Sequence, residues 1–420
     1  MHYSKNKKPY LIYIYPYKFT EFNFYLAELE DYSSEVEVEV WDLSPITTSK
    51  FAHAISQSRS LRKEVVLIKT IKHLIFKLKQ IRQISESNIV LVQNELISNS
   101  MATFFSSLLF FLMVRKTNIK ILDFYNFGVP LYYENESLST KSMFSNSGNF
   151  LFNLSSIKEF YVRIIHLFFN AFRNLFSSIH THRLVAGSQC LEYQLNNKKL
   201  GSIELVYGHS NDYSQYISQE NNSSRNKTAV FLDSAGPAFA SDSALSGRKV
   251  FFTSEEWYPA LSSFFNFFES QTSLDIKILG HYKSDHISPS PLFGGREVVY
   301  GETAKMVQKA DYVITRNSTA ISFAVVYKKP VIFVYSNQLL KDKQAMECIN
   351  GFANMLGTKP INIDEDINNF DDLLVINEEK YLSYIDAILS SNKKNLTNCN
   401  IILDKIFNIK PKYKESILAR

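Results

Sequence analysis

The sequence predicts an α/β protein with two Rossmann-like domains that face each other across a cleft. Three observations lead to this fold class: the chain is 420 residues long, strand-like and helix-like segments alternate along it, and a short polar run separates two such series. Alternating strands and helices imply parallel, doubly wound sheets with right-handed crossovers. Because a chain of this length exceeds what one hydrophobic core usually serves, two domains of about 200 residues are expected.

The N-terminal half contains the first series. A buried strand is predicted at 10–15, a helix from Thr20, and a strand at 35–43, where polar and apolar residues alternate. One long helix is expected from Leu61 to Ile84, because apolar residues recur there at helical spacing with lysines on the other face. The series continues with strands at 88–94, 118–125, 183–188 and 202–210, and with a buried helix at 101–114.

Residues 157–179 predict a strongly amphipathic helix. At helical spacing, its phenylalanines and aliphatic residues fill a broad face, and a narrow polar face carries Arg163 and Arg173. Such a helix either docks on a protein core or lies in a membrane interface, and both interpretations stay open. The apolar run at 101–114 is too short to span a bilayer, so the protein is expected to be cytoplasmic, with peripheral contact with the inner membrane as an additional option.

The second series follows a polar run that has the composition of an interdomain linker. It begins with a strand at 228–235, continues through a helix around 255–269 and a strand at 275–281, and ends in a βαβαβ unit at 296–336. Two further helical patterns precede a basic end, and the last helix is expected to cross back to the N-terminal domain. The predicted organisation is an N-terminal domain at 1–217, a linker at 218–227, a C-terminal domain at 228–376 and terminal helices at 377–420.

Composition narrows the functional classes. Hydrophobic residues make up 45% of the chain and charged residues 21%, which is typical of a globular protein with an ample core. The formal net charge of +5 is small for this length. A nucleic-acid-binding protein would show a concentrated basic face, so no nucleic-acid partner is expected. Three widely spaced cysteines argue against disulfides and a zinc cluster. A Walker motif and a GxGxxG fingerprint are absent, which disfavours an ATPase or a dehydrogenase.

Two turns in the βαβαβ unit are predicted to hold a phosphate. They consist of Gly301, Glu302 and Thr303 after its first strand, and of Asn317, Ser318 and Thr319 after its second. Both turns are expected at the carboxyl edge of a parallel sheet, where helix N-termini offer free N–H groups. Side by side, they would form a nucleotide cradle. Each turn taken alone is equally well explained as an ordinary helix cap.

Three segments of the C-terminal half together resemble a known family. FLDSAG, KILGHYKSDH and YGETAKMVQKADYVITRNSTAISFAVVYKKPVIFV, in this order, are similar to the nucleotide-binding half of two-Rossmann glycosyltransferases of bacterial surface-polysaccharide clusters. More narrowly, they resemble the set that includes bacterial sialyltransferases and related transferases of nonulosonic or octulosonic acids, which use CMP-sugar donors. The resemblance covers roughly residues 228 to 340, and the N-terminal half resembles the family in architecture only.

The resemblance implies roles for individual residues. In that family a His-Pro pair at a strand end and a later hydroxyl turn contact the donor phosphate, and an acidic residue facing the cleft is the acceptor's general base. His281 matches the histidine, and Ser318 and Thr319 match the hydroxyl turn. Tyr282 stands where the family has proline.

The chemistry of sugar transfer also selects residues by type. Negative charge grows on the departing phosphate, so the site needs hydrogen-bond donors there and a base for the acceptor hydroxyl. His281 and Lys283 are candidates for the first task, and His281 could also protonate the leaving group because histidine titrates near neutrality. His286 is predicted to be an ordinary loop residue. No paired carboxylates at ligand spacing occur, so a metal-independent reaction is expected.

The candidates for the general base are carboxylates that follow strands. Asp233 follows the first strand of the C-terminal domain, and Glu21 follows the first strand of the N-terminal domain, so the two would face the cleft from opposite sides. Asp212, just before the linker, is a weaker third candidate. Each of the first two could instead serve as a helix cap, since acidic residues favour the first helical turn.

These features predict a glycosyltransferase of bacterial capsule, O-antigen or lipooligosaccharide assembly. Its expected co-substrate is a nucleotide sugar, with a CMP-linked nonulosonic or octulosonic acid favoured and no other cofactor. Its acceptor would be a glycan or a lipid-linked glycan. Two alternatives stay open: the same fold with an NDP-hexose donor, and a non-catalytic scaffold at the membrane surface in the same pathway.

Overall fold

The computed structural model describes most of the chain. The described residues are 8–47, 58–81, 89–93, 101–115, 117–125, 180–196, 203–219, 227–238, 251–281, 284–366 and 374–410. The predicted amphipathic helix at 157–179, most of the predicted linker, and Lys283 lie outside these residues. None of the described helices is both long and apolar enough to pass through a membrane.

The N-terminal domain is built on a parallel sheet whose described strands follow the order β3-β2-β1-β4-β5-β6-β7. Its strands are β1 (Tyr10–Tyr15), β2 (Glu37–Asp42), β3 (Val65–Leu67), β4 (Ile89–Gln93), β5 (Lys120–Tyr125), β6 (His182–Val185) and β7 (Glu204–Tyr207). Apolar side chains from both faces of this sheet are buried in two separate clusters. The sheet is therefore the central layer of a doubly wound domain.

Short helices connect these strands. They are α1 (Glu21–Leu26), α2 (Leu29–Tyr32), α3 (Ser44–Thr47), α4 (Ile71–Ile81), α5 (Met101–Val114), α8 (Ser188–Asn196) and α9 (Asn211–Ser218). Helix α1 begins where the sequence predicts it, because Thr20 and Asn23 form a reciprocal capping box. The expected helix at 101–114 is also confirmed, with the same bounds.

The long helix expected from Leu61 to Ile84 is wrong in its first half. Residues Val65–Leu67 form β3, which pairs in parallel with β2, and α4 begins only at Ile71. The spacing of apolar residues suits a helix, but consecutive valines favour a strand, and pairing with β2 stabilises that strand. Tertiary pairing has overridden a local pattern here.

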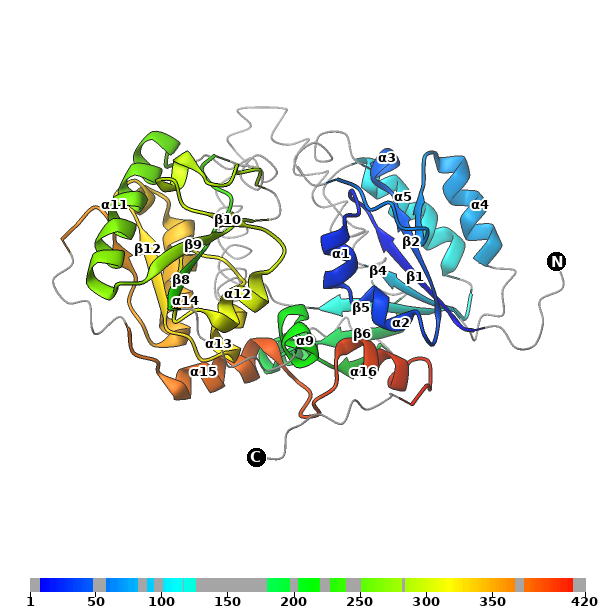
Figure 1. The fold of residues 1–420 in the computed structure, drawn as a ribbon. Coiled ribbons are helices and arrows are strands. Elements are labelled where there is room, and N and C mark those ends of the chain that lie inside the picture. Colours follow the sequence, from blue (N-terminus) through cyan, green and yellow to red (C-terminus); the bar gives the residue numbers. More distant parts are fainter. Residues whose placement is uncertain are drawn as a thin grey trace, which may run out of the picture.

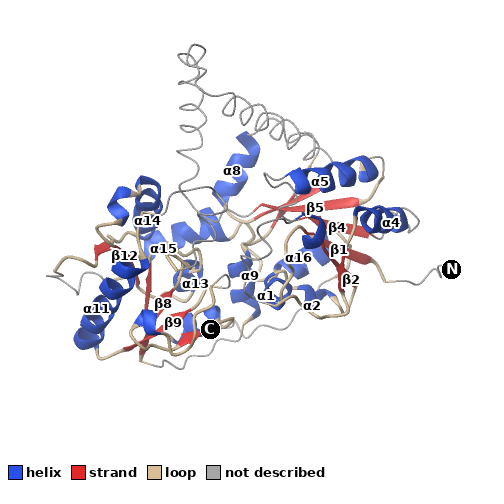
Figure 2. Ribbon diagram, turned by 90° about the horizontal axis from the view of Figure 1, so that it is seen from above, coloured by secondary structure: helices blue, strands red, loops and turns tan. Residues whose placement is uncertain are grey.

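The C-terminal domain repeats this architecture with its strands in the order β10-β9-β8-β11-β12-β13, all pairing in parallel. The strands are β8 (Thr228–Leu232), β9 (Asp275–Leu279), β10 (Val298–Val299), β11 (Tyr312–Thr315), β12 (Val331–Tyr335) and β13 (Ile361–Asn362). The two sheets stand side by side, one in each half of the molecule (Figures 1 and 2). The predicted fold class is thereby confirmed.

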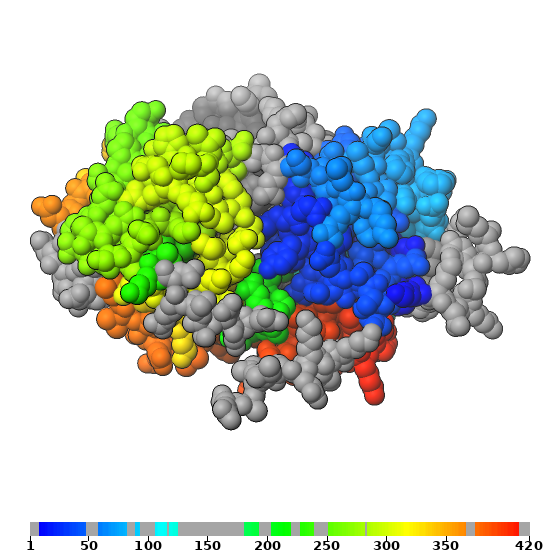
Figure 3. All heavy atoms as spheres, viewed as in Figure 1, coloured from blue at the N-terminus to red at the C-terminus, as the bar shows by residue number. Residues whose placement is uncertain are grey.

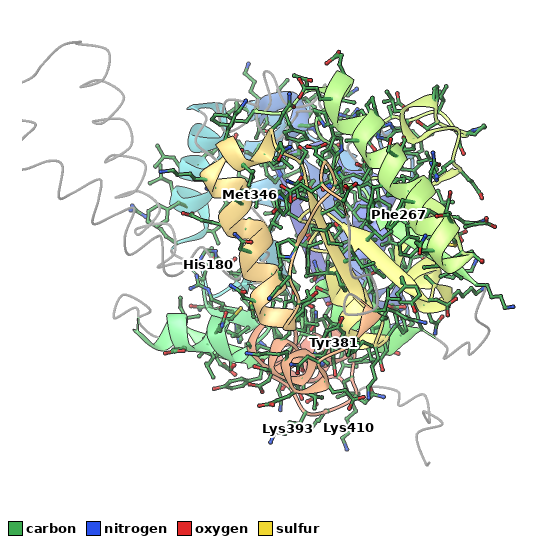
Figure 4. The ribbon with its side chains drawn as sticks, turned by 90° about the vertical axis from the view of Figure 1, so that its left-hand side faces the viewer. His180, Phe267, Met346, Tyr381, Lys393 and Lys410 are labelled. Carbon is green, nitrogen blue, oxygen red and sulfur yellow. The ribbon has the colours of Figure 1, made fainter. Side chains whose placement is uncertain are left out.

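Helices cover both faces of the C-terminal sheet. They are α11 (Ser254–Thr272), α12 (Thr303–Lys309), α13 (Ile321–Val326), α14 (Lys343–Leu356) and α15 (Glu378–Tyr384), with 3-10 turns η3 (Pro291–Phe293) and η4 (Leu339–Lys341) and a π-helical turn η6 (Ile385–Leu389). The last helix, α16 (Asn398–Lys405), lies on the N-terminal domain instead. Helix α11, with Phe267, and helix α14, with Met346, lie on opposite sides of the strands (Figure 4). Each side has its own apolar cluster.

Two segments join the domains. Helix α16 packs into an apolar cluster of the N-terminal domain through residues such as Ile402 and Ile406. Helix α9 packs against α13 of the C-terminal domain and α1 of the N-terminal one. At its end, the Gln219 amide accepts a hydrogen bond from the Tyr327 hydroxyl at 2.8 Å and donates one to Tyr25 at 3.4 Å. The surfaces of the two domains adjoin in the middle of the molecule (Figure 3).

Candidate functional site

Three neighbouring strands of the C-terminal sheet end in residues with ionisable side chains. Strand β8 lies between β9 and β11, and residue 233 follows β8 while residue 316 follows β11. The chain leaves β8 to one side towards β9 and later returns on the other side as β11, so the topology reverses between β8 and β11. Ligands of open α/β sheets bind outside the carboxyl ends of the strands at such a switch point.

Asp233 and Arg316 start from the same face of this sheet. Leu232 is paired with Thr315, so the next residues on the two strands lie opposite each other. Asp233 and Arg316 come two residues after Phe231 and Ile314, so their side chains start from the same face of the sheet as those two. Phe231 and Ile314 belong to the apolar cluster under α11. The sheet therefore directs a carboxylate and a guanidinium towards the first turn of α11.

The Asp233 carboxylate is buried and has a histidine partner. Asp233 is 4% exposed, and its Oδ2 lies 3.3 Å from Nε2 of His286. The backbone N–H of His281 donates a long hydrogen bond of 3.5 Å to the same oxygen. The expectation that Asp233 presents its carboxylate openly to the cleft is therefore not met, because the loop between β9 and β10 covers it.

His286 lies in that loop, as predicted, but it is far from an ordinary loop residue. Its side chain is 1% exposed and its ring packs edge-on against Phe293, with the ring centroids 4.9 Å apart. Its backbone N–H donates to the Tyr300 hydroxyl at 2.8 Å. These contacts hold the imidazole against Asp233. The prediction of an ordinary loop residue is therefore wrong, and the sequence signal for this position is a second histidine shortly after the strand end.

Arg316 is the residue that sequence reasoning missed altogether. It is 9% exposed, its Nε donates to Oδ1 of Asn317 at 3.0 Å, and its guanidinium lies 4.6 Å from the centre of the Phe252 ring. Its Nη1 atom is buried and has no hydrogen-bond partner among the described residues. Burial lowers the pKa of Arg316, and the negative charge of Asp233 opposes that shift. A strongly basic residue directly after an apolar strand was the available signal.

The backbone comes close to this guanidinium at Gly236. A Cβ atom at this position would lie 3.5 Å from both Nη atoms of Arg316 and 3.3 Å from the Phe252 ring. A side chain at position 236 would therefore occupy the space beside the guanidinium. The turn through Ala235, which has a φ of 63°, brings the backbone to this place.

The two predicted phosphate turns do not follow neighbouring strands. Gly301 follows β10 and Asn317 follows β11, and β9 and β8 lie between these strands. The helices that the turns open, α12 and α13, have only seven and six residues. Glu302 is exposed and pairs with Lys305 at 3.3 Å. The expected side-by-side cradle is thus not built at the strand ends, because the crossover carries the chain to the far side of β8.

The histidine and hydroxyl candidates flank the same central strand. His281 is partly buried beyond β9, and Ser318 lies beyond β11, where its N–H donates to Oγ1 of Thr315 at 3.2 Å. Two strand spacings, roughly 10 Å, separate the ends of β9 and β11. Thr319 is exposed at the start of the turn into α13. His281 and Ser318 therefore lie on opposite sides of Asp233, and the ends of their strands are not adjacent.

The other candidate bases have different surroundings. Glu21 is exposed, and hydrogen bonding with Ser60, together with its ion pair to Arg62 at 2.7 Å, lowers its pKa. Asp212 lies on α9 at the domain boundary, where burial raises its pKa to about 6 despite a hydrogen bond with Ser322. Of the two, only Glu21 has a side chain that an acceptor in solvent can reach from the N-terminal domain.

Comparison of the sequence with protein-family models gives no match, and comparison with curated proteins gives none either. Among solved structures, the wall teichoic acid polymerase TagF matches at 11% identity over 95% of this chain and 89% of that chain, with a TM-score of 0.51. A putative UDP-N-acetylglucosamine 2-epimerase from Listeria monocytogenes matches at 12% identity over 96% of both chains, with a TM-score of 0.49. The TagF match and the two parallel sheets together identify the fold as two Rossmann-like domains in the GT-B arrangement.

Proposed function

We propose that this protein is a glycosyltransferase that moves a sugar from a nucleotide-sugar donor to a glycan hydroxyl in the assembly of a bacterial surface polysaccharide. One observation carries the proposal: inside a GT-B-type fold, the switch point of the C-terminal sheet holds a buried arginine with an unused donor atom beside a buried carboxylate. The resemblance of residues 228 to 340 to surface-polysaccharide transferases supports the same conclusion, and TagF, which shares the fold, is by its name a polymerase of a cell-wall polymer.

The favoured donor is a CMP-activated nonulosonic or octulosonic acid, and an NDP-hexose is the alternative. In either case the leaving group is a phosphate, whose growing negative charge needs cationic or N–H donors. His281 at the rim and Arg316 deeper in the sheet edge are the residues that would supply them, with Ser318 and Thr319 on the other side of β8. Hydrogen-bond donors that hold the phosphate at this edge of the sheet would leave the sugar of the nucleotide sugar directed towards the N-terminal domain.

Two carboxylates divide the remaining roles. Asp233 is too deeply covered for an acceptor hydroxyl, so we assign it to positioning the charged groups of the donor side. Glu21 is the carboxylate that an acceptor can reach, and we assign it the role of general base. Hydrogen bonding with Ser60 and pairing with Arg62 lower its pKa and hence its basicity, so the acceptor must displace these contacts on binding. A lipid-linked acceptor would add the membrane contact predicted for residues 157–179.

The test is nucleotide release in the presence of a mixed glycan acceptor. CMP-linked nonulosonic acid, CMP-linked octulosonic acid and UDP-N-acetylglucosamine would be offered separately to the full-length protein. Release of CMP from one of the first two supports the favoured donor, and release of UDP alone supports the alternative. Glu21→Gln should lower the rate by about 100-fold if this residue is the base. Failure of every donor to bind or react refutes the proposal.

A further inference from the structure

We propose that Arg316 is the receptor for the phosphate group of the donor and that Asp233 and His286 keep its guanidinium available for this ligand. This inference rests on the proposed function and names the atom that recognises the donor. The chemical class of the ligand is a phosphate ester with at least two free or partly charged oxygens.

The burial of Arg316 costs solvation free energy. A charged guanidinium with five N–H donors is expensive to remove from water unless acceptors replace the water. Arg316 is 9% exposed, and its described polar contact is the one from Nε to Asn317. The rings of Phe252 at 4.6 Å and Trp257 at 6.0 Å support the cation without accepting hydrogen bonds in its plane. Among the described residues, the guanidinium thus has no carboxylate to accept hydrogen bonds in its plane.

The second step is a comparison with an arginine of equal burial. Arg183 on β6 is also 9% exposed, but its Nε and Nη2 contact Oδ2 of Asp123 at 3.0 and 2.8 Å. The chain therefore provides a carboxylate for a buried arginine where the arginine is structural. No carboxylate of the described residues lies within ion-pair distance of Arg316. Its Nη1 atom, which has no hydrogen-bond partner among the described residues, accordingly distinguishes Arg316 from Arg183.

The third step explains why Asp233 does not satisfy Arg316. The two residues lie on neighbouring strands and their charges attract, but Oδ2 of Asp233 lies 3.3 Å from His286 Nε2, at ion-pair distance without hydrogen-bond geometry. Phe293 and Tyr258 pack around the imidazole and fix it there. Asp233 therefore offsets the positive charge from a distance while leaving the outer edge of the guanidinium unbonded.

The fourth step concerns space and neighbouring donors. Gly236 leaves open the position 3.5 Å from both Nη atoms where a side chain would otherwise lie. Ser336, just beyond the end of β12, has a buried hydroxyl that also lacks a partner among the described residues. A phosphate oxygen pair matches the fork of a guanidinium and can accept from a hydroxyl as well. A planar sugar carboxylate could match the fork too, so the test separates these two sources.

The test measures what the phosphate adds to nucleotide binding. Isothermal titration would compare cytidine with CMP and uridine with UDP on the full-length wild type, on Arg316→Gln and on the matched control Arg183→Gln. The wild type and the control should bind the preferred nucleotide about 10- to 100-fold more tightly than its nucleoside. Arg316→Gln should lose this advantage while its affinity for the nucleoside stays unchanged. A preserved advantage in Arg316→Gln overturns the inference and leaves the proposed function standing.

Two further arms complete the design. Arg316→Lys keeps the charge and loses the fork, so it should retain about a tenth of the advantage, and it replaces Arg316→Gln if that variant does not fold. A free nonulosonic acid without nucleotide tests the carboxylate source: binding that depends on Arg316 overturns the assignment to phosphate. If neither nucleotide binds the wild type, the proposed function fails and this inference fails with it.

Discussion

The two halves of the molecule have the same sheet topology but treat their buried charges differently. In the N-terminal domain, Asp42 at the end of β2 is fully buried and accepts hydrogen bonds from the backbone N–H groups of Phe19 and Ser44 and from Arg59. In the C-terminal domain, the contacts of Asp233 with other described residues are a long hydrogen bond from a backbone N–H and a histidine at ion-pair distance. Within the described part of the chain, Asp42 therefore has more hydrogen-bond donors than Asp233.

The arginines repeat this contrast. Arg183 is neutralised by Asp123 within the N-terminal sheet, whereas Arg316 has no ion pair among the described residues of the C-terminal domain. Removing one partner of a buried ion pair destabilises a protein strongly, and a buried charge without a partner costs stability unless a ligand completes it. This difference between the domains supports the proposal that the edge of the C-terminal sheet binds an anion.

The largest expected effect tests this contrast through stability. Arg183→Gln should lower the free energy of unfolding by about 3 kcal/mol, because it leaves Asp123 without its partner. Arg316→Gln should leave the free energy unchanged or raise it, since it removes a buried charge that the protein itself does not satisfy. Urea denaturation of both variants measures the difference. Equal destabilisation by the two changes would mean that Arg316 is structural as well.

A second prediction concerns the carboxylate at the boundary between the halves. Burial raises the pKa of Glu28 to about 7, despite hydrogen bonds from Ser214 and the backbone of Cys399. The folded state therefore binds a proton more tightly than the unfolded state, so stability is highest below pH 4.5 for this group and falls as the pH rises towards 7. Asp212, with a pKa of about 6, acts in the same direction.

Glu28→Gln should remove most of that dependence. In the wild type, the free energy of unfolding should fall by about 2 kcal/mol between pH 5 and pH 8, and the variant should show a flatter profile. Thermal unfolding across this pH range measures both. Identical pH profiles of the wild type and Glu28→Gln would contradict the burial of a protonated carboxyl group at this position.

The smallest expected effect sharpens the comparison around Arg316. Phe252→Leu keeps an apolar side chain but removes the ring below the guanidinium, at a cost of about 1 kcal/mol in nucleotide affinity. Binding of the nucleoside should not change. As a control, Phe111→Leu removes the ring 5.7 Å from Arg115, in the N-terminal domain, and should leave nucleotide binding unaltered. A similar loss from both would point to general destabilisation instead.

The sequence predicted most of the strands because their signal is local. The βαβαβ unit at 296–336, the capped helix after Thr20 and the buried helix at 101–114 all follow from the spacing of apolar residues and from capping residues. The long helix from Leu61 failed at β3 because the same apolar spacing fits two structures. Pairing with β2 decided between them, and no local pattern contains that information.

The candidate site shows the same division. Asp233 and His281 each follow a predicted strand, and parallel strands end at the same edge of a sheet. The sequence alone was therefore enough to place both residues at that edge. The neighbours of Asp233 depended on the tertiary structure: crossovers place β8 between β9 and β11, so residues 233, 286 and 316 converge although 83 residues separate the first from the last. Pairing of distant strands and burial of single atoms are properties of the whole fold. For this reason the sequence could identify the sheet edge, while only the folded chain distinguished Arg183, which is paired with Asp123, from Arg316, which has no ion pair among the described residues.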